Sequence, residues 1–160
     1  MSNPDTNTGA APELAVDLVN ESPLWSGAHI GEHLIRALGA AAAAERRGGQ
    51  VSLLLADDAR MAGLNHAWRG RDGPTNVLAF PSAKTDPSGA FLGDIALAAE
   101  TIAAEAAAQG KTIDAHAAHL AVHGFLHLLG YDHDSKPDAE AMEARERAIL
   151  ASLGIADPYA

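Results

Sequence analysis

The sequence predicts an α+β fold in which a small mixed sheet of about four strands packs with helices. Two observations lead to this prediction. Apolar residues make up 48% of the 160 residues, alanine is abundant, and aromatic residues account for only 4%, a composition that favours closely packed helices. Short apolar runs of strand length also alternate along the chain with longer segments of helical periodicity.

The expected elements follow one another along the chain with short connections. Strands are expected where apolar residues alternate or form short runs, at 14–19, 50–56, 76–80 and 93–98. Helices are expected between capping residues and glycine stops, at 29–47, 57–68, 99–110, 113–129 and 135–153. Pro81 should end the third strand. Trp68 and Phe80 are expected in the core, the alternative being that they stack on bases.

Length and composition predict one domain over residues 13–160, because 160 residues can bury one core but are short for two. Residues 1–12 are polar and predict a disordered N-terminal tail. The sequence has no signal-peptide pattern, no apolar stretch long enough to cross a bilayer and no cysteine. A cytoplasmic protein without a membrane partner is therefore expected, and thiolate catalysis is excluded.

The net charge of −10 argues against nucleic acid as a partner. The distribution softens this argument, because residues 60–84 carry four basic side chains and only one acidic side chain, Asp72. The basic residues of this segment are Arg60, Arg69, Arg71 and Lys84. They could extend a track for phosphates, although charge alone is explained equally well by ordinary surface scatter.

The histidines are the most informative residues of the sequence. Five of the eight lie between positions 116 and 133, and the first four follow one another at spacings of 3, 4 and 4 residues. Such spacing places His116, His119, His123 and His127 on one stripe of a helix. His119 and His127 lie about 12 Å apart along the helix axis and cannot share one ion, so a third ligand must come from outside this run.

His123 and His127 are one turn apart and can reach one ion at about 2.0–2.1 Å. Gly130 breaks the helix, and His133 can then swing back to complete the site. The spacing His-x-x-x-His-x-x-Gly-x-x-His is that of metzincin proteases. Three neutral ligands leave the ion its full charge and an open fourth position, which suits water activation or anion binding. We expect one Zn²⁺ per chain, although three histidines also accept nickel, copper or cobalt.

Gly124 occupies the position at which metzincins have the glutamate that serves as general base. A protease of the usual mechanism is therefore not favoured. Three neutral ligands, together with nearby arginines, favour a phosphodiester as the substrate instead.

Residues 123–133, His-Gly-Phe-Leu-His-Leu-Leu-Gly-Tyr-Asp-His, resemble the signature of the YbeY family of bacterial single-strand endoribonucleases and rRNA maturation factors. Residues 64–70, 75–81 and 92–95 support the resemblance, as do His119, Met142 and Glu146. The resemblance covers nearly the whole chain after the first dozen residues. It implies a zincin-like α+β fold, with the metal site on a central helix and the turn after it.

The resemblance also implies a function. Residues 13–160 would form a zinc-dependent endoribonuclease domain that processes the 3′ end of 16S rRNA and takes part in ribosome maturation and quality control. The implied partners are single-stranded rRNA, the small ribosomal subunit or 70S ribosome, a ribosome-associated GTPase and a small-subunit ribosomal protein. Asn76 and Ala79 stand where family members usually have Asp and Ser, so a carboxylate or hydroxyl contribution at these positions does not carry over.

Four further residues receive expected roles. Arg69, which matches the active-site arginine of the family, would hold a phosphate through its guanidinium group. Asp132 either orients a histidine or accepts a proton, the alternative being a carboxylate that caps its own turn. His119 and Arg71 would support the ligands or contact RNA, while His119 could equally be bonded to a neighbour.

Two other functions stay open from the sequence. The first is a metzincin-like metallopeptidase, which the histidine spacing supports and Gly124 opposes. The second is a non-enzymatic ribosome assembly factor whose zinc is structural.

Overall fold

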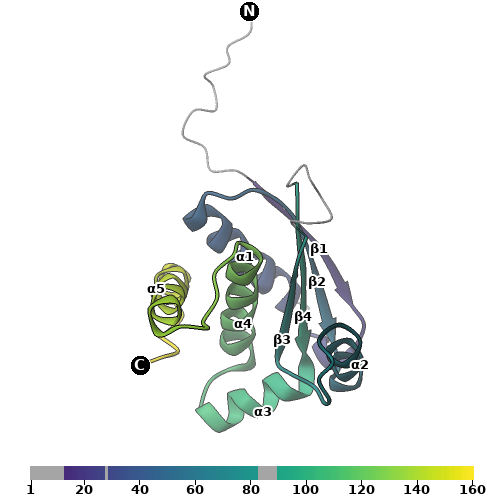
Figure 1. The fold of residues 1–160 in the computed structure, drawn as a ribbon. Helices are drawn as coiled ribbons and strands as arrows, with labels where there is room; N and C mark the ends of the chain where they lie inside the picture. Colours follow the sequence, from purple (N-terminus) through teal and green to yellow (C-terminus); the bar gives the residue numbers. More distant parts are fainter. Residues whose placement is uncertain (1–12, 28, 83–89) are drawn as a thin grey trace, which may run out of the picture.

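The computed structural model describes residues 13–27, 29–82 and 90–160. A four-stranded mixed sheet forms its centre (Figure 1), with the strands in the order β1 (Leu14–Asn20), β2 (Gly49–Ala56), β4 (Phe91–Ala98) and β3 (Val77–Pro81). Strands β1, β2 and β4 run parallel, and β3 pairs antiparallel with β4 at the edge of the sheet. The predicted α+β fold with a small mixed sheet is confirmed.

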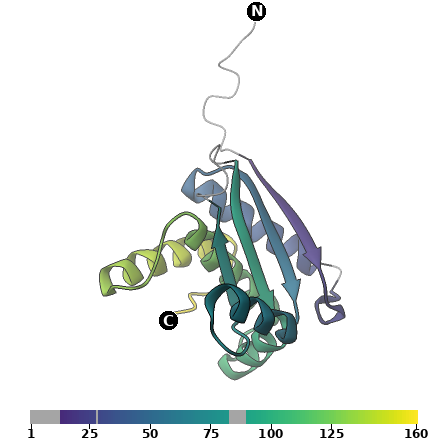
Figure 2. The same cartoon turned by 45° about the vertical axis from the view of Figure 1, so that its right-hand side comes forward.

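Helices cover the two faces of the sheet unequally (Figures 1 and 2). On one face lie α1 (Ile30–Glu45) and α4 (Ile113–Leu128), with α5 (Lys136–Ser152) packed on their outer side. The other face carries α2 (Asp58–Arg69). Helix α3 (Ala99–Gln109) connects β4 to α4, and a short 3₁₀ helix, η2 (Pro23–Trp25), follows β1. The predicted helices are confirmed, whereas the 3₁₀ helix was not expected.

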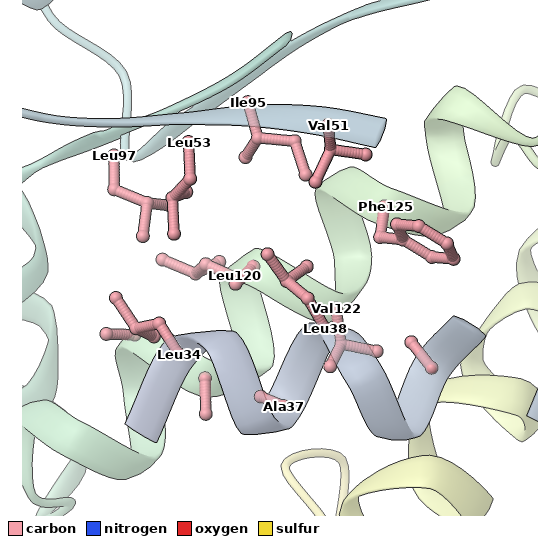
Figure 3. Packing of buried hydrophobic residues seen from close by; sticks show 14 of the residues in the cluster. Leu34, Ala37, Leu38, Val51, Leu53, Ile95, Leu97, Leu120, Val122 and Phe125 are labelled. Atoms are coloured by element: carbon pink, nitrogen blue, oxygen red, sulfur yellow. The ribbon is translucent and has the colours of Figure 1, made fainter. Parts of the chain in front are cut away.

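The main core lies between α1, α4 and the sheet (Figure 3). Helix α4 is buried on most of its circumference and is the central helix of the fold. Its apolar side chains meet those of α1 and of the two middle strands; the labelled members are Leu34, Ala37, Leu38, Val51, Leu53, Ile95, Leu97, Leu120, Val122 and Phe125. Burial of this kind stabilises a fold by about 25 cal/mol for each Å² of apolar surface removed from water, so the packing of α4 on the sheet contributes much of the stability.

Two local expectations are wrong. Strand β3 includes Pro81 instead of ending before it, because an edge strand tolerates a residue without an N–H donor. Trp68 is not in the core: 70% of it is exposed, since it lies in the last turn of α2. Phe80 is partly buried and packs against a second, smaller core cluster, so the expectation for this residue holds in part.

Some expectations fall on residues outside the described ranges, namely the N-terminal tail of residues 1–12 and Lys84. None of the described helices combines the length and the apolar character that crossing a bilayer requires.

Candidate metal centre

Three histidines converge where α4 ends and the chain turns back. His123 and His127 lie in the last two turns of α4, and Gly130 follows with φ +104°, a backbone conformation that favours glycine. The turn brings His133 back, so that one ligand atom from each of the three histidines lies within 4.8 Å of the others. The ring centroids of His123 and His127 are 4.6 Å apart, and that of His133 lies 5.7 and 5.1 Å from them. These residues could hold one metal ion.

The hydrogen bonds of the two helical histidines determine which ring nitrogens are free. His127 Nδ1 lies 2.8 Å from the Tyr131 carbonyl oxygen and must donate, because a carbonyl only accepts. His123 Nδ1 lies 3.3 Å from a carboxylate oxygen of Glu146. Both Nε2 atoms are therefore left with lone pairs, and these two atoms lie 3.1 Å apart. Two ligands of a tetrahedral ion at about 2.0–2.1 Å would sit about 3.3 Å from each other, so the pair fits a bound cation.

The surroundings of His127 favour its neutral form, which is the form that binds a cation. Burial lowers the pKa of His127, and the neighbouring His123 lowers it further. A lowered pKa keeps the imidazole neutral, which is the form that binds metal.

Glu146 of α5 accepts hydrogen bonds from side chains at the histidine cluster. It is fully buried, and its Oε1 accepts hydrogen bonds from His119 Nε2 at 2.7 Å, Tyr159 Oη at 2.8 Å and His123 Nδ1 at 3.3 Å. Burial alone would raise its pKa, but the bonds from His119 and His123 outweigh burial and lower the pKa to about 2. An ionised carboxylate thus holds the proton of His123 on Nδ1, as carboxylates commonly do for metal-binding histidines.

A second group of side chains holds the acceptor of His127 in place. The Tyr131 hydroxyl donates to Glu45 Oε1 at 2.7 Å, which raises the pKa of this tyrosine, and Arg145 Nε donates to Glu45 Oε2 at 2.6 Å. Glu45 belongs to α1 and Arg145 to α5, so two helices anchor the turn whose carbonyl receives the His127 proton. Both helical ligands are thereby fixed in the same tautomer.

The three histidines open onto a cleft of about 630 Å³ along the edge strand β3. Arg69, at the end of α2, and Asp132, in the turn after α4, line the same cleft. No carboxylate within residues 13–27, 29–82 and 90–160 forms an ion pair with Arg69, so none of these carboxylates competes with a ligand for its guanidinium. A cation site and an arginine in one cleft suit an anionic substrate such as a phosphodiester.

Comparison with known proteins agrees with this geometry. Residues 26–154 match the family Endoribonuclease YbeY. A protein named Endoribonuclease YbeY from Rhodopseudomonas palustris (strain ATCC BAA-98 / CGA009) is 45% identical, over 99% of this chain and 90% of its own.

The chain belongs to the YbeY family.

A further relative of the same name, from Beijerinckia indica, is 51% identical over 90% of this chain and 76% of its own length. The solution structure of TM1509 from Thermotoga maritima aligns with a TM-score of 0.53 at 22% identity, over 87% of this chain and 91% of that one. At this identity the alignment speaks for the fold alone. The resemblance inferred from the sequence is confirmed.

The remaining predicted site residues take different places around this YbeY cleft. His119 is bonded to Glu146 and Tyr159, as the alternative of a histidine bonded to a neighbour has it, and its role toward the ligands stays a prediction. Arg71 is exposed and is not among the residues that line the cleft. Asp132 Oδ1 accepts the Asp134 backbone N–H at 3.2 Å, so it caps its turn while it lines the cleft.

Asn76, which departs from the usual YbeY sequence, has a defined partner in the structure. Asn76 Nδ2 donates to both carboxylate oxygens of Glu105, at 3.0 and 3.3 Å. An aspartate at this position would place a second carboxylate against that of Glu105.

At Gly124, an added Cβ would come within 3.1 Å of Ile95 and 3.3 Å of Val77. A glutamate at the metzincin position would therefore crowd the packing of α4 on the sheet.

Sequence reasoning did not assign a role to Glu146, although a signal was present. The buried positions of α5 are Met142, Glu146, Ile149 and Leu150, which follow the helical spacing i, i+4, i+7 and i+8. A glutamate within an apolar stripe is costly to bury unless it is hydrogen-bonded. Its presence in the stripe could therefore have indicated that Glu146 has buried hydrogen-bond partners. Its histidine partners lie 27 and 23 residues away in the sequence, which no local pattern specifies.

Proposed function

We propose that this chain is a zinc-dependent endoribonuclease that cleaves single-stranded rRNA, acts in the cytoplasm and processes the 3′ end of 16S rRNA. The observation that carries the proposal is the convergence of His123, His127 and His133 in one cleft with Arg69. Family membership supports the same reaction, since the relatives bear the name endoribonuclease.

The side chains of the cleft divide the work. His123, His127 and His133 would hold one Zn²⁺, which supplies Lewis acidity for a phosphodiester and for its attacking nucleophile. Arg69 would donate two hydrogen bonds to the phosphate and stabilise the charge that develops on it. Asp132 would accept the proton of the nucleophile, since its carboxylate lines the cleft and only one of its oxygens is used by the turn.

Partners follow from the proposed substrate. The chain would act on the small ribosomal subunit or the 70S ribosome during ribosome maturation and quality control, together with a ribosome-associated GTPase and a small-subunit ribosomal protein. Residues 13–160 would form the catalytic domain and residues 1–12 a tail. The net charge of −10 is unusual for a protein that binds RNA unaided, which favours such protein partners. Arg71 would add a phosphate contact at the rim.

The metallopeptidase alternative has little support. Its usual general base would stand at position 124, where glycine is present and where Ile95 and Val77 would contact any added side chain closely. The non-enzymatic assembly factor is the alternative that experiment must separate.

The first experiment is cleavage of a 3′-extended 16S rRNA precursor by the zinc-loaded protein, with His127→Ala beside it and circular dichroism as the control for folding. Cleavage by the parent and not by the folded variant is expected, because the variant lacks one of three ligands. Equal cleavage by both would reveal a contaminating nuclease. No cleavage by either protein, with or without ribosomal subunits, would favour the assembly factor.

Arg69→Glu tests the phosphate contact. We expect cleavage to fall by at least about 100-fold with zinc retained, because a carboxylate repels the phosphate that the guanidinium would hold. Zinc content measured on the same sample is the control. Unchanged turnover with normal zinc content would contradict the role of Arg69.

A further inference from the structure

A second hollow lies on the opposite face of the sheet, beside α2. It has a volume of about 390 Å³. Its lining is mostly apolar and includes Leu64 and Trp68 of α2 together with Leu54, Phe80, Asp94 and Ala96 of the strands. We call it the α2 groove.

Packing in the core does not explain Trp68, the more exposed of the two aromatic residues in the α2 groove. Trp68 is 70% exposed, although burial of a tryptophan is among the most stabilising contacts a fold can make. Its ring lies 6.1 Å from that of Phe80 at an interplanar angle of 53°. This tilted arrangement leaves ring surface open to the groove, and open aromatic faces are what bases of single-stranded nucleic acids stack on.

A hydrogen-bond acceptor lies beside Phe80 in the groove. Asp94 is in register with Phe80 on β3 and with Ser52 on β2, so the three residues form a row across the sheet. Neighbouring atoms displace water from Asp94 and raise the pKa of its carboxyl group. A carboxylate that has lost part of its hydration gains from an N–H donor, and the exocyclic amino groups of bases are such donors.

The α2 groove and the metal cleft meet at the edge of the sheet. Pro81 of β3 lines both. Trp68, which lines the groove, directly precedes Arg69, which lines the cleft. Because β3 is the edge strand, an RNA strand with one phosphate at Arg69 can pass over this edge and place a neighbouring base in the groove.

We propose that the α2 groove is a nucleobase subsite of the same enzyme, in which Trp68 and Phe80 stack on a base and Asp94 accepts its exocyclic amino group. The subsite selects cytosine, adenine or guanine over uracil at a nucleotide next to the cleaved bond. Each of these three bases has an exocyclic amino group to donate, whereas the single N–H donor of uracil lies between two carbonyl oxygens that repel a carboxylate. This inference rests on the proposed ribonuclease function. An apolar side chain of a protein would pack against the rings of Trp68 and Phe80 but would offer no donor to the Asp94 carboxylate. A base offers both contacts and therefore fits the groove better.

The chain carries its own probe for this subsite. It has two tryptophans; Trp25 is buried and donates its indole N–H to the Ala56 carbonyl at 2.8 Å, whereas Trp68 is exposed. We expect a short 2′-O-methyl RNA, which resists cleavage, to quench the fluorescence of the zinc-loaded parent. Trp68→Phe should remove the quenching, and an oligonucleotide with abasic sites should not cause it.

Cleavage kinetics provide the second readout. Trp68→Ala should raise the KM for RNA by about 10-fold with kcat little changed, because the stacking is lost in ground state and transition state alike. Trp68→Phe should restore most of the affinity. Leu24→Ala is the matched control, since Leu24 is 61% exposed and does not line either cavity. Asp94→Asn should reduce the preference against uracil.

The outcomes separate the subsite from the nuclease. Cleavage by the parent without quenching, with the KM of Trp68→Ala unchanged, would overturn the subsite and leave the nuclease standing. Quenching without cleavage would uphold the base site and contradict the nuclease. Quenching by an acidic or apolar peptide and not by RNA would assign the groove to a protein partner and overturn the proposal.

Discussion

The histidine stripe of α4 consists of two halves that the sequence makes look alike. In the first half, His116 and His119 direct Nε2 to carboxylates, at 2.8 Å from Glu105 and 2.7 Å from Glu146. In the second half, His123 and His127 are bonded through Nδ1, and their Nε2 atoms face each other. The same residue type on the same face of one helix is thus structural in one half and ready to bind metal in the other.

The difference teaches that the partner of a histidine, more than its position in a pattern, decides what it can do. A histidine whose Nε2 donates to a carboxylate has spent the nitrogen that would reach a shared ion. Glu146 belongs to both halves, because it binds His119 and His123 with the same oxygen. The structural half therefore supports the half that would bind metal.

Removing one histidine from each half of the stripe tests whether only the second half binds zinc. His123→Ala should weaken zinc binding by more than about 100-fold, since even a supporting partner of a ligand is worth 10–100-fold. His116→Ala should leave zinc affinity within about twofold and instead lower the free energy of unfolding by about 1–3 kcal/mol. Competition with a chelator and urea unfolding measure the two quantities. Equal effects of both variants on zinc affinity would contradict the division.

Glu146 and Glu105, the carboxylates bonded to the two halves of the stripe, should also differ in their effect on zinc binding. Glu146→Gln should weaken zinc binding by about 10–100-fold, because the amide no longer holds the proton of His123 with a charged acceptor. Glu105→Gln is the matched control, since Glu105 is bonded only to His116 and Asn76 among the described residues. The zinc affinity of this variant should equal that of the parent. A loss of affinity in both variants would show that the effect is general.

The smallest expected effect concerns stability in acid. The pKa of Glu146 is lowered to about 2 from 4.5, so the folded state binds this proton more weakly than the unfolded state does. The stabilisation is present above pH 4.5 and is lost as the pH falls towards 2. Between pH 6 and pH 3 the metal-free parent should lose about 2 kcal/mol more stability than Glu146→Gln. Urea unfolding at several pH values tests this, and parallel curves for the two proteins would refute it.

Much of the fold could be predicted because its elements carry local signals. The strands at 50–56 and 93–98 are apolar runs, and the last helix begins at a serine whose side chain accepts the Asp138 N–H. The convergence of His123, His127 and His133 was also local, since a helical turn and one glycine bring these residues together.

What the sequence did not specify depends on tertiary contacts. The exposure of Trp68 follows from where α2 ends over the sheet, and periodicity does not contain that information. The bonds of Glu146 to His119 and of Glu45 to Tyr131 join α5 and α1 to the site across 27 and 86 residues. Such pairs become visible only when the helices are packed.

X-ray absorption at the zinc edge of the loaded protein tests the central claim most directly. Three imidazole nitrogens at about 2.0–2.1 Å and one oxygen ligand from water are predicted for the parent. His127→Ala should lose one imidazole from this shell, and His116→Ala should leave it unchanged. A shell with fewer than three imidazoles in the parent, or a spectrum that His127→Ala leaves unaltered, would contradict the assignment of His123, His127 and His133 as the metal ligands.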